Sequence, residues 1–371
     1  MIKDWKDKTL DQLCVIKTGK KDVNQGNPDG KYPFFTCARE CTFSDTYSFD
    51  SEAILIAGNG EVGICHYYNG KFEAYQRTYV LSDFVTDIDV SYLYYFVEGR
   101  LRDDFRDRRL GNAMPYIRVG MLKDIVVPVP SLKEQKRIVG ILDEKFKAIE
   151  ELKKVTEAQI QDAKELFESR HNEIFEPNPD IKNIKTFGEV CKIEGGSQPA
   201  KSFFINEPKK DYTRLIQVRD YRTDKFVTYI PKIKARRFCS KTDIMIGRYG
   251  PPIFGIFNGL EGAYNVALMK AVPDETVLDK NYFFWFLKNK KLHTFVEKSS
   301  QRAAGQSGVR KELLYQYPVP VPEITIQKKV VRELDMLSKK TNELEQVFQK
   351  KITSLEELKK SYLEQAFAGK L

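Results

Sequence analysis

Two long stretches of the chain carry apolar or small residues at the three- and four-residue spacing of an amphipathic helix. The first series is Ile138, Leu142, Ile149, Leu152, Ile160, Ala163 and Leu166, and the second is Leu334, Leu337, Thr341, Leu344, Phe348, Leu355, Leu358 and Tyr362. The spacing predicts helices over residues 132–175 and 324–367, each about 66 Å long at 1.5 Å per residue. Helices this long with one apolar stripe require a partner, so we expect them to pair with each other, antiparallel.

The residues around these stretches are typical of helix ends. Pro128 and Pro130 favour extended backbone before the first helix. Ser131 and Glu134 form a Ser-x-x-Glu capping box, which satisfies amide donors at the helix start. The second helix lacks this box because Ile326 stands at the position of Glu134, and Gly369 is a plausible C-terminal cap.

The chain also repeats itself. Residues 117–130 read IRVGMLKDIVVPVP and residues 309–322 read VRKELLYQYPVPVP, an offset of 192, and Gln135 and Gln327 follow at the same offset. Upstream the similarity continues at offsets of 177 to 190, as between Cys14 and Cys191 or between Tyr75 and Tyr264. The frame that joins the copies is therefore constant, whereas the loops inside the globular parts differ.

The two globular parts contain short β-like runs punctuated by Gly and Asn-Gly turns, together with aromatic-rich helical stretches. These patterns predict an α+β fold in which two globular domains are joined by two long antiparallel helices that form a coiled coil, with an internal pseudo-twofold repeat. The predicted segments are a first domain at 1–130, its helix at 131–176, a second domain at 177–322 and its helix at 323–371.

Composition supports two ordinary soluble domains, because 42% of the 371 residues are hydrophobic. No apolar run reaches the length of about 18 residues that a membrane span needs, and the charged N-terminus lacks a signal peptide, so we expect a cytoplasmic protein. Cys14 and Cys191 are expected to be buried thiols, and His171 to lie on a solvated helix face. The spacing of Cys37, Cys41 and Cys65-His66 is poor for zinc, so no metal site is expected.

Charge is distributed unevenly between the two globular parts. Residues 177–322 carry 25 basic and 14 acidic side chains, a net charge of +11, whereas residues 1–130 carry 17 and 19, a net charge of −2. A basic domain favours a polyanionic partner such as nucleic acid. The second domain is therefore expected to supply most of any salt-dependent DNA affinity.

Several motifs together resemble one known family. They are Gly111-Asn112-Ala113, the Val-Pro-Val-Pro step, the helix start at residues 131–138 and the C-terminal run LEELKKSYLEQAFAGKL at 355–371. In this combination the whole chain is similar to the specificity subunit of type I restriction-modification systems. The second copy departs from the usual Glu-Gln pair, because it has Ile326-Gln327.

The resemblance implies that each globular part is a target recognition domain that reads one half of a bipartite, asymmetric site on double-stranded DNA. The helices would set the gap and dock two modification subunits, which methylate adenine at N6, and restriction subunits would join the complex. S-adenosylmethionine, ATP and Mg²⁺ would be bound by those partners, and this chain would hold no cofactor. No adenine-flipping or phosphate-loop motif occurs in the sequence, in agreement with a subunit without catalytic residues.

Base reading requires side chains with paired donors and acceptors, such as Arg, Asn and Gln, and phosphate contacts require cations. The first-domain candidates are Thr18, Lys20, Lys21, Asn59, Tyr75, Gln76, Arg77, Arg108 and Arg109. The second-domain candidates are Ser197, Gln198, Lys201, Gln217, Arg219, Tyr221, Arg222, Arg236, Arg237, Arg248, Tyr249, Tyr264 and Asn265. The candidates for the spacer and for subunit docking are Gln135, Ile138, Leu142, Ile149, Leu152, Gln327, Leu334, Leu337, Leu344, Leu355, Leu358 and Tyr362.

Two alternatives remain open at this level. The chain could be the specificity subunit of a related system that methylates without restricting, because the partner subunits decide that. It could also be a coiled-coil scaffold without a DNA role, although a scaffold does not explain the duplicated domains or the basic second half.

Overall fold

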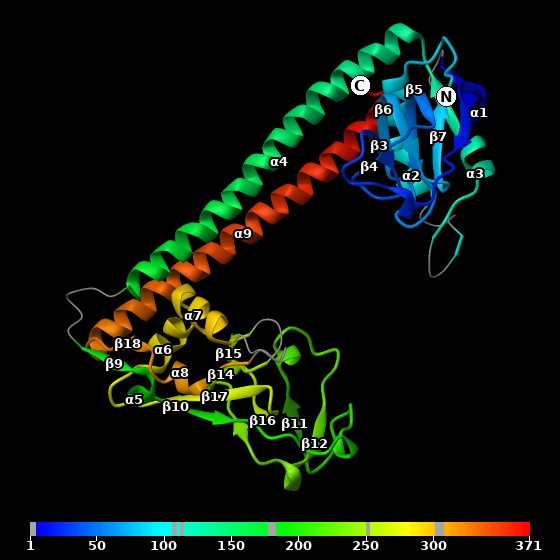
Figure 1. Ribbon diagram of the computed structural model, residues 1–371. Helices are drawn as coiled ribbons and strands as arrows, with labels where there is room; N and C mark the ends of the chain where they lie inside the picture. The colour runs from blue at the N-terminus through cyan, green and yellow to red at the C-terminus, as the bar shows by residue number, and fades with distance from the viewer. Residues whose placement is uncertain (1–4, 106–109, 112–114, 177–182, 250–252, 301–307) are drawn as a thin grey trace. The chain divides into compact units, whose positions relative to one another are not determined.

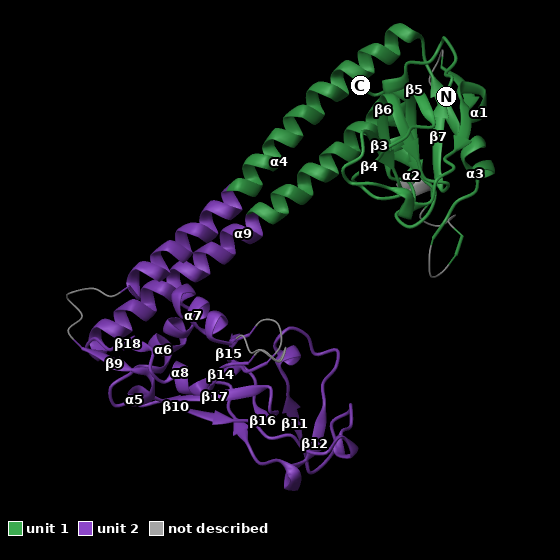
Figure 2. Cartoon of the chain, viewed as in Figure 1, with its two compact units in different colours: residues 1–158, 348–371 green, residues 159–347 purple. Residues whose placement is uncertain are grey.

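The computed structural model describes residues 5–105, 110–111, 115–176, 183–249, 253–300 and 308–371, with the backbone alone at 102–104. The chain divides into two compact units (Figure 2). Unit 1 comprises Met1–Ala158 with Phe348–Leu371, and unit 2 comprises Gln159–Val347. Each unit therefore combines one globular part with a portion of both long helices. Both helices are present as predicted, α4 at Leu132–Ile174 and α9 at Ile324–Phe367.

The two helices run antiparallel within each unit (Figure 1). In unit 1, Lys153 of α4 forms an ion pair with Glu356 of α9. In unit 2, Lys164 pairs with Glu345, and Arg170 pairs with Glu333, each at 2.7 Å. Partner numbers fall along α9 as they rise along α4, which is the antiparallel order that the apolar stripes predict.

The helix ends follow the sequence signals in part. The amide of Glu134 donates to the Ser131 hydroxyl at 3.4 Å, which is one half of the predicted capping box. The Glu134 carboxylate instead binds the Arg137 guanidinium at 2.7 and 2.8 Å. At the other end of the chain, Gly369 has φ +64°, the left-handed conformation of a glycine cap.

Unit 1 is built on one six-stranded sheet in the order β2-β7-β5-β6-β3-β4. Its strands are β2 Val15–Thr18, β3 Tyr32–Phe35, β4 Thr42–Ser44, β5 Phe49–Ala57, β6 Cys65–Ala74 and β7 Thr78–Ser82. A separate pair joins β1 Lys6–Thr9 to β8 Val126–Val129. The helices are α1 Leu10–Leu13, η1 Val23–Gln25, α2 Val90–Asp104 and α3 Val119–Lys123. The core between this sheet and α2 also takes in Leu355, Leu363 and Ala366 of α9.

Unit 2 repeats this arrangement, but its sheet is broken in two. One sheet has the order β10-β17-β14-β15 and the other β12-β11-β16-β13. The strands are β10 Cys191–Gly195, β11 Tyr212–Ile216, β12 Tyr229–Pro231, β13 Phe238–Cys239, β14 Ile244–Gly247, β15 Ile256–Phe257, β16 Gly262–Tyr264 and β17 Leu268–Pro273. The single long β6 of unit 1 corresponds to β15 and β16 here. The interruption lies at residues 258–261, which include Gly259 at φ +94°.

The remaining elements of unit 2 also have counterparts in unit 1. The strand pair β9 Ile184–Thr186 with β18 Pro318–Pro320 corresponds to β1 with β8. The helices are α5 Phe187–Val190, η2 Lys201–Phe203, η3 Val218–Tyr221, η4 Lys232–Lys234, α6 Lys280–Leu287, α7 Lys290–Ser300 and α8 Lys311–Leu314. The predicted internal repeat is thus present in the elements and in their pairing.

A buried glutamine joins each long helix to its globular part. Gln135 and Gln327 are both 0% exposed. The Gln135 amide accepts from the Asp89 backbone N–H at 2.7 Å and donates to the carbonyls of Asp87 and Pro130 at 3.0 and 2.9 Å. Gln327 repeats these bonds with Asp279 N–H and the carbonyls of Val277 and Pro322, at 2.7, 2.9 and 2.7 Å. We call this arrangement the glutamine latch.

No helix among the described residues is long and apolar enough to cross a membrane.

Candidate nucleic-acid interface

Four loop segments gather at one end of the β-structure in unit 2, which we call the loop end. They follow β10, β11, β14 and β16, and backbone hydrogen bonds connect them. Gly196 N–H donates to Leu268 O at 3.1 Å, and Asn265 N–H donates to Ile216 O at 3.1 Å. Arg248 N–H donates to Ala267 O at 2.8 Å, and Val309 N–H donates to Arg248 O at 3.2 Å. Segments that are more than a hundred residues apart are thereby held in one surface.

Unit 1 has the same four backbone hydrogen bonds at equivalent positions. Gly19 N–H donates to Thr78 O at 3.2 Å, and Tyr75 N–H donates to Phe35 O at 3.0 Å. Gly58 N–H donates to Arg77 O at 3.0 Å, and Ile117 N–H donates to Gly58 O at 2.9 Å. Backbone groups make these bonds whatever the side chain, so the frame persists while the residues on it differ. We use the term loop end for this surface in unit 1 as well.

One glycine in each loop end is required by close packing of backbone. A Cβ at Gly19 would lie 2.0 Å from the Ala74 carbonyl oxygen, and a Cβ at Gly196 would lie 1.9 Å from that of Asn265. Real Cβ atoms essentially never approach another atom below 3.0 Å. The first and fourth loop segments can therefore meet only through these glycines.

In unit 1, three of the predicted residues come together. Asn59, Tyr75 and Arg77 line a cavity of about 810 Å³ with Tyr116 and Arg118. Thr18, Lys20 and Gln76 are exposed at the same end of the sheet. Arg108 and Arg109, together with Asn112 and Ala113 of the family motif, lie outside the described residues.

Lys21, a predicted DNA contact, is held by polar groups of its own domain. Its ammonium group lies 3.5 Å from the carboxylate of Glu73, whose side chain is 0% exposed. It also donates to the hydroxyls of Ser44 and Thr46, at 2.8 and 2.6 Å. A buried carboxylate requires a compensating charge, so Lys21 stabilises the fold of the loop end where it stands.

In unit 2 the predicted residues divide into exposed and inward-facing groups. The exposed ones are Gln198, Lys201, Arg219, Arg222, Arg236, Arg237 and Tyr249. Ser197, Gln217 and Arg248 are half-buried. Tyr264 and Asn265 are buried, and the Asn265 side chain accepts from Ala267 N–H at 3.1 Å, which holds its own turn.

Tyr221 also faces inward. Its ring stacks on Phe257, with centroids 4.6 Å apart and an interplanar angle of 13°. Burial raises the pKa of Tyr221 well above its ordinary value. Its hydroxyl is buried without a hydrogen-bond partner among the described residues. As it stands in the free chain, Tyr221 shapes the loop rather than presenting its hydroxyl.

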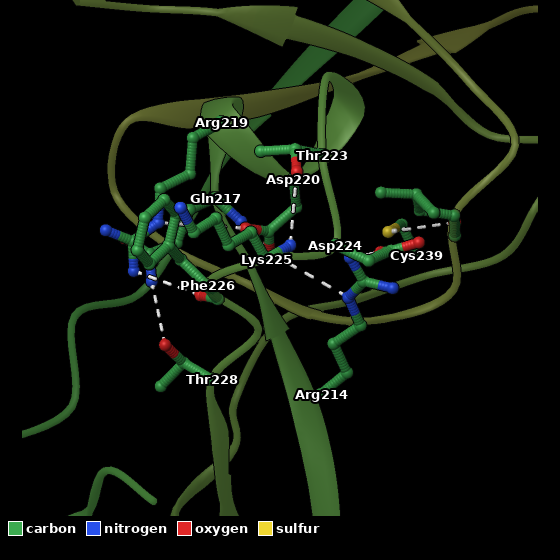
Figure 3. Close-up of polar contacts among 11 residues, drawn as sticks. Arg214, Gln217, Arg219, Asp220, Thr223, Asp224, Lys225, Phe226, Thr228 and Cys239 are labelled. Atoms are coloured by element: carbon green, nitrogen blue, oxygen red, sulfur yellow. Dashed lines mark hydrogen bonds and ion pairs between the residues drawn. The ribbon is translucent and has the colours of Figure 1, made fainter. Parts of the chain in front are cut away.

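A buried carboxylate organises the segment after β11 (Figure 3). The Asp220 side chain is 0% exposed, and its Oδ2 accepts from Gln217 N–H at 3.1 Å. Arg214 Nε lies 3.8 Å from Oδ2, and Arg219 Nε lies 3.9 Å from Oδ1. Burial raises the pKa of Asp220, against the opposing effects of the Gln217 bond and the two arginines. Asp220 thus fixes the base of this loop.

The side chains around Asp220 place the predicted reading residues. Arg219, which is 51% exposed, donates to Phe226 O at 3.3 Å and lies 5.8 Å from the centre of the Phe226 ring. Gln217 Nε2 donates to the Thr228 hydroxyl at 3.3 Å, which holds this side chain beside the Asp220 loop. The sequence did not single out Asp220, although an acidic residue between Arg219 and Arg222 was the signal for it.

The predicted docking and spacer residues also separate into two groups. Gln135, Ile138, Leu142, Ile149, Gln327, Leu334 and Leu355 are buried in the two units, and Leu337 and Tyr362 are half-buried. Leu152, Leu344 and Leu358 are 45%, 45% and 42% exposed. Only the second group offers apolar surface to another subunit in this structure.

One expectation from the sequence is wrong. His171 is 5% exposed rather than solvated. Its ring stacks on Phe167 and meets Trp285 edge-on, and its Nε2 lies 2.9 Å from the Trp285 carbonyl oxygen. Burial lowers the pKa of His171. The apolar stripe of α4 is wider here than in a two-helix coil because α6 packs on the same helix.

The buried thiols are as expected, since Cys14 and Cys191 are 6% and 5% exposed. Burial raises the pKa of each to about 12. Within the described ranges, no group of three or more His, Cys, Asp or Glu side chains is arranged to hold a metal ion.

Comparison with known proteins agrees with the fold and its repeat. The model of the type I restriction modification DNA specificity domain matches residues 2–162 and 179–354. The chain therefore belongs to this family, as its motifs indicate, and it carries the specificity domain twice.

Named relatives are type I specificity subunits. The chain is 41% identical over 150 residues to the EcoDI specificity subunit of Escherichia coli, a match that spans 40% of this chain and 33% of that subunit. It is 24% identical over 341 residues to the type I specificity subunit S.MpnORF507P of Mycoplasma pneumoniae, covering 88% of each.

Solved structures show the same fold at low sequence identity. A chain from a structure on complex assembly and conformational transition of the type I R-M system has a TM-score of 0.76 at 17% identity, covering 100% of this chain and 99% of that one. The HsdS subunit from Thermoanaerobacter tengcongensis has a TM-score of 0.58 at 16% identity, covering 100% and 98%.

Proposed function

We propose that the chain is the DNA-reading subunit of a type I restriction-modification complex. The loop end of unit 1 reads one half of an asymmetric, bipartite site on double-stranded DNA, and the loop end of unit 2 reads the other half. The observation that carries this proposal is the repeated frame of four backbone hydrogen bonds. Two similar frames with different side chains suit two short elements of different sequence.

The chemistry of the exposed side chains supports DNA as the partner. Arginine can donate two hydrogen bonds to guanine, and Asn or Gln can pair with adenine in the major groove. Arg77 and Asn59 meet in the unit 1 cavity, and Arg219 and Gln217 stand on the Asp220 loop of unit 2. Each loop end therefore carries both kinds of reading group.

The helix pair fits the role of spacer and docking surface. The glutamine latch fixes the start of each helix to its globular part, which defines the position of each loop end on its own helix. Apolar side chains on the helices remain exposed, including Leu152, Leu344 and Leu358 at 42% to 45%. Exposed apolar patches mark interaction sites, so two adenine-N6 modification subunits would dock here, with restriction subunits joining them.

In this complex the chain itself performs no chemical step. S-adenosylmethionine, ATP and Mg²⁺ would be held by the modification and restriction subunits, in the cytoplasm of the host. The contribution of this chain is the choice of DNA sequence and of the gap between the two half-sites.

The test is methylome sequencing of the host with and without the gene, followed by complementation with single variants. We expect deletion to remove one bipartite motif with methylated adenine in each half. Arg77→Ala should alter recognition of one half only, and Arg219→Ala of the other half only. Lys339→Ala, at an exposed lysine of α9 that is paired with Glu343, should restore the motif unchanged.

Two results would count against the proposal. One is that deletion removes no methylated motif, and the other is that Arg77→Ala and Arg219→Ala alter the same half. Retained methylation motifs without restriction of unmodified phage DNA would instead identify a methylation-only system.

A further inference from the structure

Basic side chains collect at one edge of the loop end in unit 2, where Arg248 and Tyr249, which follow β14, meet residues 308–311. Tyr249 and Gly308 form an isolated β-bridge, and Val309 N–H donates to Arg248 O at 3.2 Å. A Cβ at Gly308 would lie 2.9 Å from the ring of Tyr249, which is an exposed side chain, and unit 1 has Tyr116 at the equivalent position of its bridge. Arg248, Arg310 and Lys311 therefore belong to one short stretch of surface.

These cations, Arg248, Arg310 and Lys311, have no ion-paired carboxylate in the part of the chain that the structure describes. The Arg248 guanidinium lies 4.7 Å from the centre of the Tyr249 ring, and Lys311 Nζ donates to the carbonyl of Ile193 at 3.3 Å. Burial and the nearby charge of Arg248 lower the pKa of Lys311, against the opposing effect of the neighbouring Glu312 carboxylate, which forms no ion pair with it. Like charges held together without an acidic partner are satisfied by an anion from outside.

The equivalent edge of unit 1 has the same backbone but fewer charges. Asn59 and Tyr116 form the corresponding bridge, and Ile117 N–H donates to Gly58 O at 2.9 Å. At the positions of Arg248, Arg310 and Lys311, this unit has Gly58, Arg118 and Val119. At these three positions one arginine is retained and two cations are absent, and Arg77 is a second arginine that lines the same cavity as Arg118.

We propose that Arg248, Arg310 and Lys311 form a binding site for backbone phosphates of DNA, and that Arg118 is its single counterpart in unit 1. This inference rests on the proposed function and deepens it, because it separates phosphate contacts from base reading. The two units would then hold DNA unequally at the same edge of the loop end, with unit 2 making the larger electrostatic contribution.

The physical basis of the inequality is counterion release. Each phosphate that a cation neutralises makes the plot of the logarithm of the binding constant against the logarithm of salt concentration steeper by about 0.9. Phosphate contacts carry no sequence information, so they hold the duplex in register while the neighbouring loops read bases. The arginine shared by both units would supply the common contact, and Arg248 with Lys311 the additional ones.

The experiment measures binding of the full chain to a fluorescein-labelled duplex of random sequence by anisotropy, over a series of salt concentrations. Arg310→Gln combined with Lys311→Gln should reduce the magnitude of the slope by about 1.8, and Arg118→Gln by about 0.9. Arg310→Gln alone should reduce the magnitude of the slope by about 0.9. This single variant keeps the test valid if loss of the Lys311 contact disturbs folding. The charge-conserving pair Arg310→Lys with Lys311→Arg should retain the wild-type slope.

The control is Lys339→Gln, which removes one exposed charge from α9 and should leave the slope unchanged. If the chain binds DNA and the Arg310/Lys311 pair of substitutions changes the slope no more than Lys339→Gln does, this inference is overturned while the proposed function stands. If the wild-type chain binds no duplex even at low salt, the proposed function fails and the inference fails with it.

Discussion

The glutamine latch predicts a large and local loss of stability when Gln327 is replaced by Met. Methionine has a similar length and volume, so it should fill the site without leaving a cavity. It cannot replace the three hydrogen bonds, which leaves the Asp279 N–H and the carbonyls of Val277 and Pro322 buried without this partner. Each unsatisfied buried group costs about 1–3 kcal/mol, so with three such groups we expect the free energy of unfolding to fall by about 3 kcal/mol or more.

The assay is urea unfolding followed by tryptophan fluorescence. The chain has two tryptophans, and Trp285 is 8% exposed in the core of unit 2, where its indole donates to Asp335 at 2.9 Å. Trp5 packs on the core of unit 1, so a Trp5→Phe background leaves Trp285 as the reporter of unit 2. The loss should be read from the shift of the unfolding midpoint at constant slope.

Gln346→Met provides the matched control, because Gln346 is an exposed glutamine of the same helix and lies in unit 2 with Gln327 and Trp285. An exposed substitution of this kind should change stability by less than about 0.5 kcal/mol. If Gln327→Met costs no more than this control, the three buried bonds contribute nothing net, and the latch cannot be what fixes the helix to its globular part.

Three further predictions concern packing, thiol reactivity and pH. Gly196→Ala should cost about 2 kcal/mol or more in urea unfolding, because its Cβ would meet a backbone oxygen at 1.9 Å. Gly195→Ala, where a Cβ has open space, should be nearly neutral, and equal losses would contradict the packing argument. With Ellman's reagent, the exposed Cys41 should react in the native state. Cys191 should react only on unfolding, because burial raises its pKa to about 12. Similar reaction rates for the two thiols in the native state would refute this. Burial lowers the pKa of His171, so the unfolded chain binds more protons and stability should fall as pH drops below about 6.5. His171→Phe should flatten that fall, and an unchanged pH profile would show that His171 is not its source.

The long helices and the repeat could be predicted from the sequence because their causes are local. Apolar spacing, the prolines before each helix and the 192-residue offset are all visible in short windows, and α4 and α9 begin where these signals stand. The break of the sheet in unit 2 could not be predicted from the sequence. It lies around Gly259 at φ +94°, and the equivalent Gly70 has φ +133° within the unbroken strand β6, so neither glycine reveals the break from the sequence.

The arrangement of the loop ends could be predicted only in part. Turn-rich segments with Arg, Asn and Gln were recognisable as candidates, but their meeting depends on parallel pairing of strands that are far apart in sequence, β3 with β6 and β11 with β16. The burial of Tyr264 follows from that pairing and from nothing nearby in the chain. His171 was misplaced for a similar reason, because the helix that covers it begins more than a hundred residues later.

The duplicated frame explains how two similar domains can bind different DNA elements without losing their fold. Its four hydrogen bonds use backbone groups. Backbone excludes a Cβ at Gly19 and Gly196, and also at Gly58, where a Cβ would lie 2.4 Å from the Arg77 carbonyl oxygen. Side chains elsewhere on the frame can differ, and unit 2 carries Arg248 at the position of Gly58. Substitution there alters the charge offered to the duplex without altering the bonds that hold the loops. Reading and stability are therefore separated within each unit, and the charge difference between residues 1–130 and 177–322 is a difference in surface on a common backbone.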